Sequence, residues 1–117
     1  MDLTSWTERV VAAIGDVADL VFQQRAWLGT GPEISSFVET YCTLYDDNAF
    51  AAFLAQQAWP QTGLAPAVRQ EMILLDQLLR AYQEPGSDAE ILADPRWREV
   101  AHQAQRVLQA IEEGASK

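Results

Sequence analysis

Cysteine and histidine are almost absent from this sequence of 117 residues, which contains one of each, Cys42 and His102. A lone cysteine excludes an internal disulfide and any zinc site built from several thiolates. A single histidine excludes a histidine-rich metal site and leaves little for acid–base catalysis. We therefore expect neither a bound metal nor a cofactor.

Basic residues are also scarce. The chain has 8 Lys and Arg residues against 17 Asp and Glu residues, a formal net charge of −9 at pH 7. Nucleic acids and anionic membrane surfaces are bound by cation-rich faces. The charge balance therefore argues against both as direct ligands.

Long hydrophobic runs are missing as well. The longest strictly apolar stretches have only a few residues, whereas a membrane-spanning helix needs about 20. The first residues contain an acid, Asp2, and no Lys or Arg, unlike the positively charged start of a signal peptide. Together with the free thiol, these features predict a cytoplasmic protein.

The usual motifs of enzymes are absent too. The sequence contains no phosphate-binding loop, no dinucleotide glycine pattern and no His–Glu metal motif. The turn at residues 29–32 (GTGP) is too short to cradle a phosphate and lacks the following lysine, so we interpret it as a helix stop. The sequence therefore predicts a protein that is not an enzyme.

The patterns that are present are helical. Apolar residues recur at helical spacing over four long segments, residues 4–28, 35–45, 65–82 and 95–111, and over short segments near residues 50–54 and 87–93. With 49% hydrophobic residues the chain can form a core. The expected fold is all-α: a single compact bundle of four main helices and one or two short ones, over residues 1–113. Residues 114–117 are expected to form a frayed C-terminal tail.

Capping patterns mark where these helices begin. A serine followed three residues later by a glutamate has the spacing of a capping box, and this pattern occurs at Ser5, Ser36 and Ser87. Pro66 is expected at a first helical position, and Asp94 is expected to cap the last helix. The helix over residues 65–82 is the most apolar, which predicts that it is the central one. Gly15 is a candidate for close approach by a neighbouring helix.

Three polar features have a structural interpretation at this point. Cys42 lies on the predicted core face of its helix, so we expect it to be buried. His102 lies off the apolar face of the last helix and is expected at the surface. Of the adjacent Asp46 and Asp47, at least one is expected to cap the following short helix.

The distribution of charge is the most informative pattern. No basic residue lies between Arg25 and Arg69. That interval instead combines acidic and aromatic residues: Trp27, Glu33, Glu39, Tyr41, Tyr45, Asp46, Asp47 and Trp59. Acids beside aromatics suit a docking face for a basic protein, in which carboxylates steer the encounter and aromatics anchor it. The alternative is a solvated acidic rim over a core that uses these aromatics.

Residues 24–37 (QRAWLGTGPEISSF), which lead on to Tyr45-Asp46-Asp47, carry a resemblance to a known class. The stretch resembles small acidic immunity or immunity-like proteins of bacterial polymorphic toxin systems. These systems include contact-dependent inhibition, Rhs-type toxins and type VI secretion effectors. The resemblance is strongest over residues 24–54 and recurs at the helix start at Asp94-Pro95-x-Trp97.

This resemblance implies a protein that binds and neutralises a cognate toxin domain by blocking its active site, which we expect to be basic. The expected contact residues are Glu33, Glu39, Tyr41, Asp46 and Asp47, with Trp27 and Trp59 as second choices. We expect a monomer or a weak homodimer. The alternative is a non-enzymatic helical adaptor or self-assembling structural domain, which would expose a hydrophobic surface too large for a monomer, first of all along residues 65–82.

Overall fold

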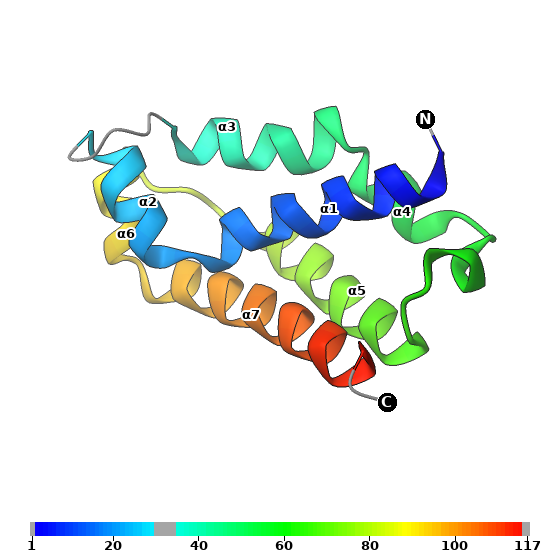
Figure 1. Ribbon diagram of the computed structural model, residues 1–117. Helices are drawn as coiled ribbons and strands as arrows, with labels where there is room; N and C mark the ends of the chain where they lie inside the picture. The colour runs from blue at the N-terminus through cyan, green and yellow to red at the C-terminus, as the bar shows by residue number, and fades with distance from the viewer. Residues whose placement is uncertain (1, 30–34, 116–117) are drawn as a thin grey trace.

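The computed structural model of the chain describes residues 2–29 and 35–115, in which all regular structure is helical (Figure 1). The predicted all-α class is confirmed. In chain order the elements are α1 (Leu3–Ala18), α2 (Leu20–Trp27), α3 (Phe37–Cys42), the π-helix η1 (Thr43–Asp47), α4 (Phe50–Ala55), the 3-10 helix η2 (Trp59–Thr62), α5 (Pro66–Ala81), α6 (Asp88–Ala93) and α7 (Pro95–Ala115).

The last helix, α7, organises the packing. It lies against both α1 and α5, and Figure 1 shows α1 between α7 and the α3–η1 segment. The helices α2 and α6 pack together at one end of the molecule, and α4 lies at the other. One continuous hydrophobic cluster takes in at least one buried side chain from each of these elements. Within the described ranges, no helix combines the length and apolar character needed to cross a membrane.

The prediction that α5 is the central helix is wrong. Its buried side chains form a single stripe, Val68, Met72, Leu75 and Leu79, while Leu74 is 48% exposed. The helix α5 has more apolar residues than it buries, so composition overstated its burial. The position between two long helices belongs instead to α7.

The single helix predicted over residues 4–28 is two helices that meet at Asp19. The Asp19 side chain caps α2, and the break is supported from inside the core by Gln23, which is fully buried. The Gln23 Nε2 donates hydrogen bonds of 2.8 Å to the carbonyl oxygens of Asp16 and Val17. The Trp97 Nε1 donates to Gln23 Oε1 at 2.8 Å. A residue distant in the sequence thus helps to hold the break.

Most predicted helix starts are confirmed. Ser36 and Ser87 each accept a hydrogen bond from a backbone N–H in the first turn of α3 and α6. Asp94 does the same for α7, and Pro66 is the first residue of α5. Local sequence was sufficient at these four positions, because the three capping side chains bond N–H groups two or three residues away and the fixed φ of proline suits a first helical position.

Three smaller predictions about the helices need correction. The N-cap of α1 is Asp2, whose carboxylate accepts from the Ser5 backbone N–H at 2.9 Å, so Ser5 is not the cap. Among the described residues, no neighbouring helix comes within 4 Å of the position of a Cβ at Gly15. The helix α7 continues through Ala115, two residues past the predicted boundary of the helical domain.

Candidate functional site

The acidic residues predicted to bind a partner lie on one helical segment. The helices α3 and η1 follow each other without a gap, and Glu39, Asp46 and Asp47 are all exposed on them. Cys42 lies between two of the three along this segment, because it follows Glu39 by three residues and precedes Asp46 by four, so each is about one helical turn away. We call Glu39, Asp46 and Asp47 the acidic strip. Glu33, the fourth predicted acid, lies outside the described residues.

The acidic strip ends at a corner of the backbone, at Asn48, which hydrogen bonds to Thr43 and Trp6 hold in place. The backbone N–H of Asn48 donates to the Thr43 carbonyl oxygen at 3.1 Å, which closes the wide π-turn. The Asn48 side-chain amide donates to the same oxygen at 2.7 Å. The Asn48 carbonyl oxygen in turn accepts a hydrogen bond of 2.6 Å from the indole N–H of Trp6 on α1. These contacts fix the backbone beside Asp46 and Asp47.

The predicted capping role of Asp46 or Asp47 is wrong. The helix α4 has Ala49 at its N-cap and no side-chain cap hydrogen bond. Ala49 has φ = 48°, a left-handed conformation that costs energy for a residue with a Cβ. The chain therefore turns sharply after Asn48, and both carboxylates are left for solvent. Single π-turns and strained residues of this kind cluster at functional sites.

Tyr41 is half-buried and belongs to a stacked pair. Its ring lies 4.7 Å from that of Tyr45 at an interplanar angle of 30°. The Tyr45 hydroxyl donates to Asp76 Oδ1 on α5 at 2.6 Å, and Asp76 also forms an ion pair with Arg80 at 3.0 Å. Burial, followed by the hydrogen bond to Asp76, raises the pKa of Tyr45 far above its ordinary value, so the hydroxyl remains a donor. Tyr41 is thus anchored to α5 through its neighbour.

A groove of about 310 Å³ opens beside these residues, between α3 and the C-terminal end of α5. Val38, Tyr41 and Cys42 line it from α3, and Leu79, Tyr82 and Glu84 line it from α5 and the residues that follow. Val38 is 58% exposed, although it is apolar. We call this feature the α3–α5 groove. Sequence reasoning missed it because no local pattern pairs residue 38 with residues 79–84.

Cys42 is half-buried in this groove, so its predicted place in the core is wrong. The hydrogen bond to Asp46, burial and the nearby charges of Asp46 and Asp47 together raise the pKa of the Cys42 thiol. A thiol with a raised pKa is largely protonated at neutral pH and is a poor nucleophile. The residue therefore offers packing and a hydrogen bond rather than reactive sulfur.

The two tryptophans predicted as second-choice contact residues are buried. Trp27 packs against Trp97, with ring centroids 5.7 Å apart, and is 7% exposed. Trp59 packs against Phe53 at 5.5 Å, and the Arg69 guanidinium lies 5.3 Å above its ring. Their large apolar rings are used by the core, which was the alternative interpretation of the aromatic residues. Neither ring contributes to the acidic strip.

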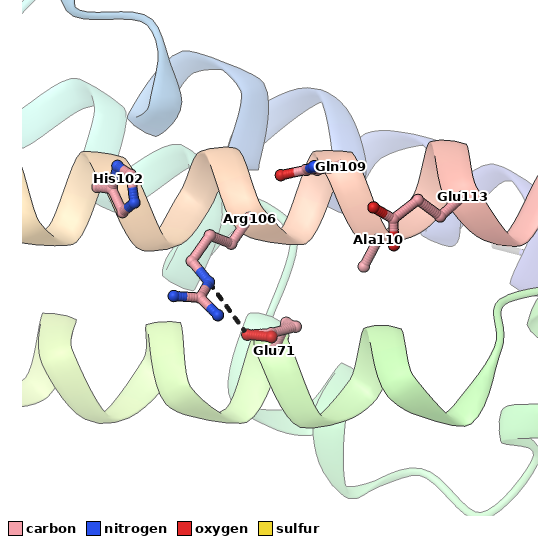
Figure 2. A pocket seen from close by; sticks show the side chains of 6 residues that line it. All are labelled: Glu71, His102, Arg106, Gln109, Ala110 and Glu113. Atoms are coloured by element: carbon pink, nitrogen blue, oxygen red, sulfur yellow. Dashed lines mark ion pairs between the residues drawn. The ribbon is translucent and has the colours of Figure 1, made fainter.

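A second groove, of about 400 Å³, lies between α5 and α7 and is polar (Figure 2). Figure 2 shows Arg106 reaching from α7 towards Glu71 on α5, an ion pair of 3.9 Å. Glu71 also accepts from Gln103 Nε2, at its backbone oxygen and at Oε1. His102 lines this groove and is exposed, as predicted. Glu71 connects α5 to α7 through Gln103 and Arg106, so we interpret the polar residues of this groove as a structural network.

No cluster of three or more His, Cys, Asp or Glu side chains suited to a metal ion occurs in the part of the chain that the structure describes. Comparison of the chain with models of protein families, with curated proteins and with solved structures found no match. Among the described residues, we therefore take the acidic strip and the adjoining α3–α5 groove as the candidate functional site.

Proposed function

We propose that this chain is an immunity protein that binds and neutralises a cognate bacterial toxin domain, without chemistry of its own. The observation that carries the proposal is the acidic strip. Glu39, Asp46 and Asp47 share one helical segment and are all exposed. The sequence has no basic residue between Arg25 and Arg69. A surface of one sign recognises a surface of the other, here the basic active site of a toxin.

Charge and rigidity favour this role together. A net charge of −9 accelerates encounter with a basic partner, and the acidic strip gives that attraction a direction. The hydrogen bonds of Asn48 to Thr43 and Trp6 hold the corner in place before any partner arrives. A prearranged surface loses less conformational entropy on binding. The acidic strip is therefore suited to fast and tight association.

The test is co-expression with the C-terminal domain of the protein encoded immediately upstream, scored for growth rescue and for co-purification. Rescue together with a stable complex supports the proposal. No rescue and no complex would reject this pairing. A solution mass that rises with concentration in light scattering would then favour the adaptor or self-assembling alternative.

Charge reversal tests whether the acidic strip is the surface involved. The variant Asp46→Lys/Asp47→Lys should slow association about tenfold or more and abolish rescue. The matched control, Glu99→Lys/Glu113→Lys, makes the same change of net charge at exposed positions of α7. Neither aspartate caps α4, so circular dichroism should show both variants folded. Equal loss in both variants would mean that overall charge, and not the acidic strip, drives binding.

A further inference from the structure

The α3–α5 groove combines an apolar surface with a position at the edge of the acidic strip. Val38, at 58% exposure, is one of the few large apolar side chains that the described residues leave to solvent. It lines the groove together with Tyr41 and Leu79. The groove volume of about 310 Å³ is enough for a large side chain from another molecule.

Two carboxylates, those of Glu84 and Asp46, belong to this groove or to the helical turn beside it. Glu84 lines the groove itself. Asp46 is exposed and follows Cys42, which lines the groove, by four residues, so it lies about one helical turn beyond this wall. The one basic lining residue, Arg80, is paired with Asp76 at 3.0 Å. The local charge therefore complements a cation and would repel an anion.

The walls of the groove are fixed by contacts to other helices. On one side Tyr41 stacks on Tyr45, which is hydrogen-bonded to α5. On the other side the Tyr82 hydroxyl donates to Asp94 at 2.9 Å, and its ring lies 5.4 Å from that of Trp97. The groove is thus formed in advance by side chains that already have their partners.

We infer that the α3–α5 groove receives an apolar side chain of the toxin, flanked by lysine or arginine residues that pair with Glu84 and Asp46. This inference rests on the proposed function and names the part of the site that anchors the partner. A second copy of this chain is a poor occupant, because each copy carries a net charge of −9. The exposed valine supplies the apolar contact, and the carboxylates select the charge.

The test uses three capped tripeptides and the 15N-labelled protein: lysine–leucine–arginine, lysine–alanine–arginine and glutamate–leucine–aspartate. In the millimolar range, the first should shift the backbone amide signals of Val38, Tyr41, Cys42 and Leu79. The alanine peptide should bind about tenfold more weakly, because it lacks most of the apolar side chain. The acidic peptide should produce no shifts there.

A matched pair of variants locates the anchor. Val38→Ser should lower the affinity for the leucine peptide about tenfold. Val21→Ser, at an exposed position of α2, should leave this affinity unchanged. Equal affinity for the leucine and alanine peptides, shifts spread evenly over all acidic residues, or no shifts at all would overturn the inference. Groove shifts that grow with protein concentration in the absence of peptide would identify a second copy as the occupant and also overturn it.

The growth assay separates this inference from the proposed function. If rescue succeeds and the groove binds no peptide, the inference fails and the immunity role is retained. If the groove binds the leucine peptide selectively and no rescue occurs, the pairing with the upstream toxin is rejected, whereas the groove is confirmed as a docking site for basic, apolar segments.

Discussion

The buried amide of Gln23 should be one of the most costly polar groups to remove. The variant Gln23→Met retains the length and flexibility of the side chain but removes three hydrogen bonds of 2.8 Å. It leaves the Trp97 indole N–H without its acceptor at a site that is 1% exposed. It also leaves the Asp16 and Val17 carbonyl oxygens without the amide that joins them.

The magnitude follows from these groups. An unsatisfied buried donor such as the Trp97 N–H costs about 2 kcal/mol, and the loss at the buried Val17 carbonyl adds about 1 kcal/mol. We expect the free energy of unfolding to fall by about 3 kcal/mol, a large part of the stability of a domain of this size. Scaled by the usual unfolding entropy per residue, this loss lowers the melting temperature by about 12 °C.

Urea unfolding followed by circular dichroism measures this change, and Gln24→Met, at the exposed neighbouring position, is the matched control. The double variant Gln23→Met/Trp97→Phe removes both partners of one bond. It should therefore be less destabilised than the sum of the two single variants, by about 1–2 kcal/mol. A loss of less than about 1 kcal/mol in Gln23→Met, or simple additivity, would refute the role assigned to this amide.

Three further changes have defined outcomes. Ala49→Gly should raise the free energy of unfolding by about 1 kcal/mol because it relieves the left-handed backbone, whereas Ala52→Gly inside α4 should lower it by a similar amount. Ser36→Ala removes the N-cap of α3 and should lower the free energy of unfolding, measured in urea, by about 1 kcal/mol. Burial and hydrogen bonds to aspartates raise the pKa of Tyr45 and Tyr82, whose ordinary value is 10.0. Their contribution to stability is therefore complete below pH 10.0 and is lost as the pH rises above it. Alkaline unfolding should show this loss, and Tyr45→Phe and Tyr82→Phe should each reduce it.

The helices that could be predicted from the sequence are those whose ends are determined locally. Pro66, Ser87 and Asp94 act on residues within the same turn, so their helices begin where expected. The break at Asp19 could not be predicted, because no glycine or proline lies next to it in the sequence. It is supported by Gln23, which contacts Trp97 from the far end of the chain, and such a contact depends on the packed core.

The candidate site was predictable only in part for the same reason. Charge alone indicated Glu39, Asp46 and Asp47, and the structure places them on one segment. The burial of Trp27 depends on its packing against Trp97, which no pattern near either residue reveals. The α3–α5 groove likewise exists only after α5 has packed beside α3, because its walls come from both elements.

The π-turn at η1 also has a consequence for how this surface can change during evolution. A π-turn holds one residue more than an α-turn between the same two ends. Deletion of one residue within Thr43–Asp47 can therefore turn η1 into ordinary α-helix while Phe37 and Phe50 stay in the core. The same deletion in α3 would rotate one flank by about 100° and displace its buried side chains. The surface that carries Asp46 and Asp47 can thus be reshaped by a change of chain length at this corner, while the buried side chains on either side keep their packing.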